Sequence, residues 1–219
     1  IPTMIDEIGL NKDDVYAHTA SFSFSSSIRQ LFVPLINGNT LSIANDEERK
    51  QPEKFIKYLY GQKINVIDIV PTFLCSCITF FNKNPNDNIK DLLSGLKLRL
   101  ILSASEIMFR NMPSLWHEFF GKNVIILNMY GQTETSGIVA LGNVDHMMES
   151  DCNSIPIGKP ITKTSLYIVN ENNEFLPKGA LGEIVISGNG ISGGYINQPK
   201  LTKELFIKKN SNGVEITYY

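Results

Sequence analysis

The sequence has few cysteines and no long apolar run, and each shortage excludes a class of protein. Its three cysteines, Cys75, Cys77 and Cys152, form no CxxC pair and no plausible zinc set. Cys75 and Cys77 lie in an apolar segment, where core packing is the expected role. The longest apolar runs are about six residues, well short of the roughly 20 that cross a bilayer. We therefore expect a reducing, cytoplasmic setting and no membrane partner.

A basic surplus is also missing. The 20 lysines and arginines against 22 acidic residues give a net charge of −2, which argues against nucleic acid as the main partner. No Ser-His-Asp set emerges either, so a hydrolase reading has little support. In 219 residues, a hydrophobic content of 42% is enough for the core of one large domain or two smaller ones.

Residues 1–150 alternate between short apolar runs and helical patterns. This alternation predicts a parallel sheet with helices on both faces. Strands are expected over 15–20, 40–44, 66–70 and 98–102 and from 124, helices after Ser25, Pro52, Pro71 and a Ser105 cap, and a surface loop over 82–88. Ligands bind such sheets at the carboxyl ends of the strands, so the 103–105 turn, the 130–134 turn and the Ser25 cap are expected to converge on one cleft.

The pattern changes in residues 151–219. Prolines and glycines punctuate short alternating runs at 166–169 and 183–186, which predicts a β-rich second domain. The glycines of 188–194 precede Tyr195 and a short helix over 201–206. We interpret these glycines as turn geometry rather than a phosphate cradle, since no helix opens directly after them.

The stretch Asn128 to Thr135 carries the most chemistry. The apolar run 124–127 predicts a short buried strand, after which the chain turns through Tyr130 and Gly131. The hydroxyl of Thr133 suits a phosphoryl oxygen and the carboxylate of Glu134 suits Mg²⁺, while the Tyr130 ring offers a face for a purine. A polar strand-to-loop turn without a ligand fits the spacing equally well.

Several stretches in register resemble the adenylate-forming enzymes, the superfamily of peptide synthetase adenylation domains, acyl-CoA synthetases and luciferases. They are Leu100–Glu106, Asn128–Thr135, Ile155–Pro160, Gly182–Gly188, Gly194–Pro199 and Leu201–Phe206. The sequences of these stretches are most similar to those of the nonribosomal peptide synthetase branch. The resemblance covers residues 16–219. The resemblance implies an α/β fold, with a parallel-sheet subdomain followed by a small β-rich subdomain of distorted-barrel type.

The resemblance also implies a reaction and roles. A carboxylic acid attacks the α-phosphate of ATP, pyrophosphate leaves, and the acyl group passes to the 4'-phosphopantetheine thiol of a carrier protein within a synthetase. Thr133 and Glu134 are the implied catalytic residues, with Glu134 holding Mg²⁺. The implied nucleotide-binding residues are Ser103, Ala104, Ser105, Asn128, Met129, Tyr130, Gly131 and Gln132.

Three elements of this family have no match here: the phosphate loop with its lysine, the aspartate that holds the ribose, and the lid lysine. The chain therefore resembles the middle of a larger enzyme. We expect it not to turn over by itself.

The implied acyl pocket departs from the family pattern at its anchor. Peptide synthetases usually place an aspartate after a phenylalanine to pair with the substrate α-ammonium, and here Ser25 follows Phe24. A desolvated ammonium without a counter-charge costs several kcal/mol, which disfavours an ordinary α-amino acid. The other matching positions are Ser26, Arg29, Asp68, Ile101, Ser103, Met129, Gly137 and Ile138.

Asp68 lies in an apolar strand and needs a partner. Arg29 could supply it. Alternatively, Asp68 faces a cationic group of a β-amino or other non-α-amino acid, or the substrate is an aryl or keto acid that needs no ammonium partner.

Two other functions remain open. Gln132 occupies a position where peptide synthetases more often carry proline, which favours a free-standing acyl- or aryl-CoA ligase. A non-catalytic binding module that keeps the fold is the other alternative, although the retained Thr133 and Glu134 count against it.

Overall fold

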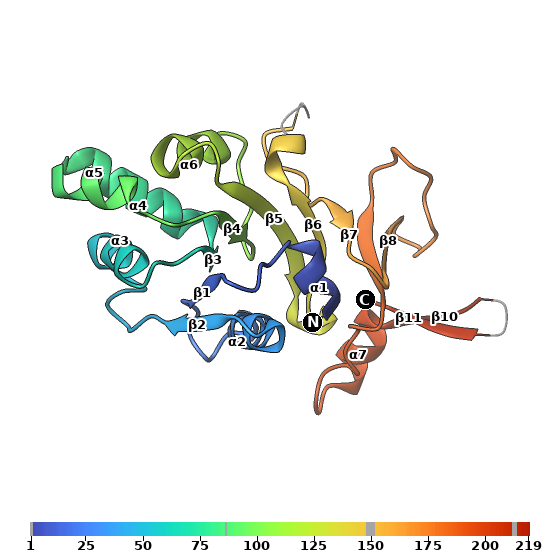
Figure 1. Ribbon diagram of the computed structural model, residues 1–219. Coiled ribbons are helices and arrows are strands. Elements are labelled where there is room, and N and C mark those ends of the chain that lie inside the picture. Colours follow the sequence, from blue (N-terminus) through green and yellow to red (C-terminus); the bar gives the residue numbers. More distant parts are fainter. Residues whose placement is uncertain (1, 86, 148–151, 212–213) are drawn as a thin grey trace. The chain divides into compact units, whose positions relative to one another are not determined.

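The computed structural model describes residues 2–85, 87–147, 152–211 and 214–219 (Figure 1). The chain forms two compact units. The first comprises residues 1–130 and 141–158, and the second comprises 131–140 and 159–219. The division expected at residue 150 differs from these units.

Parallel strands form the centre of the first unit. They are β1 (Val15–His18), β2 (Thr40–Ile43), β3 (Val66–Ile69), β4 (Leu100–Ser103) and β5 (Ile125–Gln132), in the order β2-β1-β3-β4-β5. β6 (Gly137–Asn143) follows β5. The register places Asp68 beside Leu102, and Ser103 beside both Ile69 and Asn128. The parallel order confirms the expected fold class.

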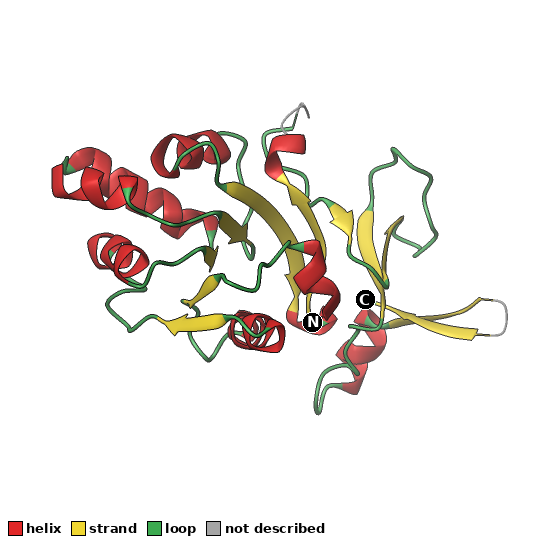
Figure 2. Ribbon diagram, viewed as in Figure 1, coloured by secondary structure: helices red, strands yellow, loops and turns green. Residues whose placement is uncertain are grey.

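One helix precedes these strands and the others lie between them in the chain (Figure 2). They are α1 (Pro2–Glu7), α2 (Ser25–Asn37), α3 (Pro52–Gly61), α4 (Pro71–Lys83), α5 (Asp87–Ser94) and α6 (Met112–Phe120). α3, α4 and α6 each have a proline in the first turn, where no intrahelical N–H is needed. α2 ends at Gly38, whose φ of 81° is left-handed. A glycine at this position is typical of the end of a helix.

The main core lies between the sheet and the layer of α3, α4 and α6. Ala17, Ile67, Ile101 and Ile126 point into it, together with the fully buried Trp116. Because strand side chains alternate, Tyr16 and Asp68 point to the opposite face, where α2 lies and contacts Asp68. The alternation of side chains along β3 therefore places the carboxylate of Asp68 against α2.

The second unit contains a four-stranded antiparallel sheet in the order β10-β11-β9-β8. Its elements are β8 (Thr164–Val169), β9 (Glu183–Gly188), α7 (Pro199–Leu205), β10 (Ile207–Ser211) and β11 (Val214–Tyr218). The short β7 (Lys159–Pro160) precedes them, and the next residue, Ile161, donates to the Val139 carbonyl at 3.0 Å. The β-rich character expected for this part is confirmed.

Four local expectations were wrong. Ser105 does not cap a helix: it has a φ of 73° and α6 begins seven residues later. The 82–88 loop is shorter than expected, because α4 runs to Lys83 and α5 begins at Asp87. The N-cap of α2 is Phe24 rather than a serine. β5 does not turn at Tyr130 but continues to Gln132, because pairing with a neighbouring strand overrides the local glycine signal.

No helix among the described residues is long and apolar enough to cross a membrane.

Candidate active site

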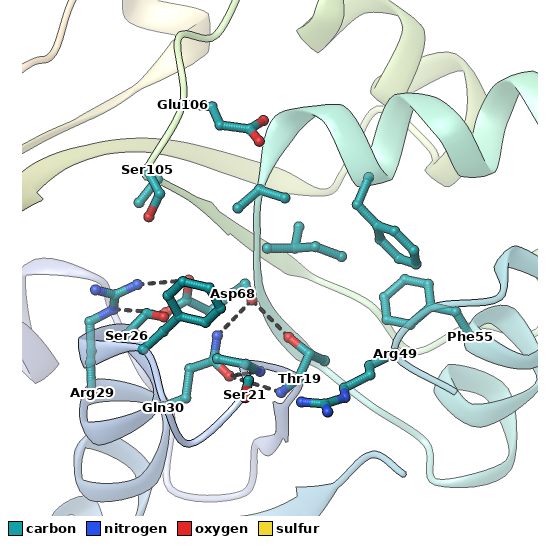
Figure 3. Close-up of a pocket in the computed structure, with 16 residues that line it drawn as sticks. Thr19, Ser21, Ser26, Arg29, Gln30, Arg49, Phe55, Asp68, Ser105 and Glu106 are labelled. Carbon is teal, nitrogen blue, oxygen red and sulfur yellow. Dashed lines mark hydrogen bonds and ion pairs between the residues drawn. The ribbon is translucent and has the colours of Figure 1, made fainter. Parts of the chain in front are cut away.

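A cavity of about 450 Å³ opens in the first unit, at the carboxyl ends of β1, β3 and β4 (Figure 3). Its volume is in the range of small-molecule sites. Four of the expected acyl-pocket residues line it: Phe24, Ser26, Arg29 and Asp68. Ala104 and Ser105 of the expected nucleotide turn line it as well. Glu106, at the end of the Leu100–Glu106 stretch, also lines it. Sequence reasoning missed the other lining residues, which are Thr19, Ala20, Ser21, Gln30, Arg49, Phe55, Ile69, Val70 and Phe73.

Arg29 and Asp68 form a two-bonded ion pair in this cavity. Nε of Arg29 donates to Oδ2 of Asp68 at 2.8 Å, and Nη2 donates to Oδ1 at 2.9 Å (Figure 3). The side chains are only 11% and 4% exposed. Burial disfavours the charged guanidinium, yet the charge of Asp68 and these hydrogen bonds leave the Arg29 pKa raised. Of the open readings for Asp68, the structure therefore supports the one in which Arg29 is its partner.

Tyr16 closes the inner side of this pair, with its hydroxyl 3.4 Å from Oδ2 of Asp68. Burial first, and the charge of Asp68 second, raise the pKa of Tyr16 well above its usual value. Tyr16 therefore stays a neutral hydrogen-bond donor. The carboxylate of Asp68 thus faces one cation and one hydroxyl of its own chain.

Gln30 fixes α2 against the strand ends. Its Nε2 donates to the Asp68 carbonyl at 2.9 Å, and its Oε1 accepts from the main-chain N–H groups of Thr19 and Ala20 at 2.8 and 2.9 Å. Gln30 is 2% exposed. A buried amide with three such bonds holds a cavity wall rigidly.

Of the nearby Ser103 and Glu106, only Glu106 lines the cavity. Ser103 is fully buried, and among the described residues its Oγ has no hydrogen-bond partner. Glu106 accepts from the main-chain N–H and the hydroxyl of Thr72 at 3.0 and 2.9 Å. This bond places a carboxylate at the first turn of α4, where the helix dipole favours negative charge. Glu106 therefore stabilises α4 at the edge of the cavity.

The remaining expected residues divide between the two units. Ile101, Ser103, Asn128, Met129 and Tyr130 belong to the first unit. Ser25 is not among the cavity-lining residues. Asn128 is 5% exposed, and its Nδ2 donates to the Pro156 carbonyl at 2.8 Å. Gly131, Gln132, Thr133, Glu134, Gly137 and Ile138 belong to the second unit.

The Thr133–Glu134 motif lies on η1 (Thr133–Thr135), a single 3-10 turn between β5 and β6. The main-chain N–H of Gln132 donates to Oγ1 of Thr135 at 3.2 Å. Gly131 has no space for a side chain, since a Cβ there would lie 2.1 Å from the Gly137 carbonyl oxygen. This tight approach presents Thr133 and Glu134 at the tip of the turn, and Thr133 is exposed.

A tyrosine that sequence reasoning did not assign holds Glu134. The Tyr195 hydroxyl donates to Oε1 of Glu134 at 2.7 Å and lies 3.2 Å from the Tyr219 hydroxyl. The bond from Tyr195 is the main cause that lowers the pKa of Glu134. The position of Tyr195 after a glycine-rich loop was visible in the sequence, but not its partner 61 residues away.

The donor set fits a weakly held Mg²⁺. Among the described residues no three His, Cys, Asp or Glu side chains gather into a metal cluster. Glu134 supplies one partly exposed carboxylate. Mg²⁺ is commonly bound by one or two carboxylates together with substrate phosphates, so Glu134 could hold it with a nucleotide present.

Comparison with known proteins matches this chain to one family and to a relative of known name. The model of the family described as "AMP-binding enzyme" matches residues 2–196. Bacitracin synthase 1 of Bacillus licheniformis is 31% identical over 209 residues, which are 91% of this chain and 4% of that protein. The chain thus spans only a small part of such relatives.

Solved structures agree on the fold. The Vibrio cholerae adenylation domain AlmE in complex with glycyl-adenosine-5'-phosphate has a TM-score of 0.79 and 23% identity, over 100% of this chain and 39% of that chain. The Klebsiella oxytoca fusion NpsA-ThdA, an adenylation-PCP di-domain, has a TM-score of 0.76 and 21% identity, over 98% of this chain and 40% of that one.

Proposed function

Because the chain belongs to the AMP-binding enzyme family, we propose that it is part of an enzyme that joins a carboxylic acid to AMP. In this reaction a carboxylate oxygen attacks the α-phosphorus of ATP and pyrophosphate leaves. The phosphopantetheine thiol of a carrier protein in nonribosomal peptide synthesis then attacks the acyl carbonyl carbon, so that a thioester forms and AMP leaves. The observation that carries the proposal is the family match over residues 2–196, which includes the cavity and the Thr133–Glu134 turn.

Each residue of the expected nucleotide site has a proposed role that depends on where it lies. Thr133 is exposed at the tip of η1 and would contact the α-phosphate. Tyr130 would stack on adenine, and the 103–105 main chain would border the base. The Asn128 amide already donates to the Pro156 carbonyl, so we assign it the positioning of that segment. Reactions of this kind depend mostly on positioning and charge neutralisation.

Glu134 would hold Mg²⁺ beside the phosphates. A bound Mg²⁺ supplies neutralisation of phosphate charge. The chain's own contribution is the Tyr195 hydroxyl, which donates to the carboxylate and lowers the Glu134 pKa.

The cavity supports a substrate without an α-ammonium group. Ser25 supplies no charge at the anchoring position, and Arg29 already neutralises Asp68. Glu106 is engaged by Thr72. The aromatic side chains of Phe24, Phe55 and Phe73 line the same cavity. We therefore favour an aryl or keto acid over a β-amino acid.

Coenzyme A is the alternative acceptor, which Gln132 suggested. The structure gives Gln132 a local role, because its N–H bonds to Thr135 and its φ is −147°. Proline has no N–H and a φ near −65°, so glutamine here serves the turn. This role weakens Gln132 as a sign of the acceptor and favours the carrier protein. Equal acyl transfer to coenzyme A and to the carrier would contradict that choice.

Acid-dependent exchange of pyrophosphate into ATP by the full-length protein tests the proposal. Exchange that requires both an acid and Mg²⁺, and is lost in Glu134→Ala, is the expected result. A full-length protein that binds ATP with Mg²⁺ but never exchanges would contradict it. Failure to bind ATP at all would support the non-catalytic module. The cytoplasmic location stays a prediction.

A further inference from the structure

The glycine-rich loop of the second unit reaches the η1 turn and contacts it at three points. Ser192 N–H donates to the Glu134 carbonyl at 2.8 Å, and Tyr195 Oη donates to the Glu134 carboxylate at 2.7 Å. Gly190 lies so close that a Cβ would be 2.6 Å from the Thr135 carbonyl oxygen. Both the main chain and the side chain of Glu134 are therefore held by one loop.

Tyr195 is itself fixed before it reaches Glu134. Its main-chain N–H donates to Oγ1 of Thr202 in α7 at 2.8 Å. Its ring packs edge-on against Phe206 at a centroid distance of 5.7 Å. Gly194 has a φ of 110°, and a Cβ at this position would lie only 2.3 Å from the side chain of Thr202. The tyrosine is thus oriented by the helix that follows it.

Tyr219 completes the hydrogen-bond chain. Its hydroxyl is 3.2 Å from that of Tyr195, and its ring packs on Phe206 at 4.9 Å. Because one hydroxyl has one proton, Tyr195 donates to Glu134 and accepts from Tyr219. This order directs the Tyr195 proton to the carboxylate.

We propose that Tyr195 is a positioning residue for the metal site: it fixes the rotamer of Glu134 so that the carboxylate meets Mg²⁺ bound with the nucleotide. The inference rests on the proposed function. A flexible glutamate on a partly exposed turn loses rotamer freedom when it binds a cation. A hydrogen bond that already fixes it removes part of that cost and strengthens cation binding.

Tyr195→Phe in the full-length protein is the test, because phenylalanine keeps the ring packing on Phe206 and removes only the hydroxyl. We expect the Mg²⁺ concentration for half-maximal exchange to rise about three- to tenfold, the size of the net contribution of one typical hydrogen bond. The KM for the acid should stay unchanged. Tyr219→Phe should give a smaller rise, because the 2.7 Å bond to the Glu134 carboxylate comes from Tyr195.

Mn²⁺ binding with a non-hydrolysable ATP analogue, followed by electron paramagnetic resonance, gives a readout independent of turnover. Tyr195→Phe should weaken Mn²⁺ binding in the wild-type background and add nothing in Glu134→Gln. Tyr167→Phe is the matched control: it removes a tyrosine hydroxyl from the same unit, where the ring packs on Phe175 and Tyr218, and should leave binding unchanged.

The outcomes separate the two proposals. Unchanged Mn²⁺ binding in Tyr195→Phe, with wild-type binding that depends on Glu134, overturns the positioning role and leaves the function standing. A lower melting temperature with unchanged Mg²⁺ dependence shows a structural role only and also overturns it. Wild-type protein that binds no Mn²⁺ with the analogue overturns both.

Discussion

The Arg29–Asp68 pair shows how a buried charge is satisfied by its own chain. Both side chains are nearly inaccessible, so removal of one partner leaves the other uncompensated. We predict that Arg29→Met lowers the free energy of unfolding by about 3–5 kcal/mol, measured by urea unfolding.

Two controls accompany Arg29→Met. The double change Arg29→Met with Asp68→Leu should recover most of the loss, because no charge is left buried. Lys57→Met breaks an exposed pair with Glu53 and should change stability by less than about 1 kcal/mol. If Arg29→Met lowered the free energy of unfolding as little as Lys57→Met, the Arg29–Asp68 pair would not be desolvated.

Ser25 sets a second prediction at the residue scale. Ser25→Asp supplies the carboxylate that the family pattern places after Phe24. It should move exchange activity toward α-amino acids by about tenfold relative to aryl acids, since a charge-assisted bond contributes about 1.5–3 kcal/mol. The measurement is exchange with matched pairs of acids, with Ser25→Asn as the uncharged control. An unchanged preference contradicts the missing-anchor argument.

At the scale of elements, α2 depends on how it ends. Gly38 has φ of 81° and open space around it, so an alanine there meets strain without a clash. Gly38→Ala should cost about 1 kcal/mol in urea unfolding. Gly61→Ala at the end of α3 also meets open space, but without a positive φ. It should be neutral or stabilising by up to about 1 kcal/mol, and an equal loss in both variants would refute the conformational cause.

The elements also show where local sequence rules were sufficient. Pro52 and Pro71 open helices and Gly38 ends one, because these residues act on their own backbone. Ser105 is a residue type that often caps a helix, but here its backbone is left-handed and it caps none. Its side chain lines the cavity instead. Tyr130 and Gly131 read as a turn, yet strand pairing carries β5 past them to Gln132.

At the scale of the whole molecule, we expect these 219 residues to hold only part of the family's site. They contain no match to the family's phosphate loop, ribose aspartate or lid lysine. We predict that a polypeptide of these residues alone shows no acid-dependent pyrophosphate exchange, while the full-length protein does. Exchange by the 219 residues at a rate comparable to the full-length protein would show that the missing motifs are dispensable.

The sequence by itself determined the family, the parallel α/β order and the identity of the Thr133–Glu134 motif. These follow from periodicity, from residues that act on their own backbone and from motifs in register. Only the tertiary structure decided that Arg29 neutralises Asp68 and that Tyr195 holds Glu134. Those pairs are 39 and 61 residues apart, and a hydrogen bond depends on where two side chains meet in space. Spacing along the chain carries no such information until the strands and helices are packed.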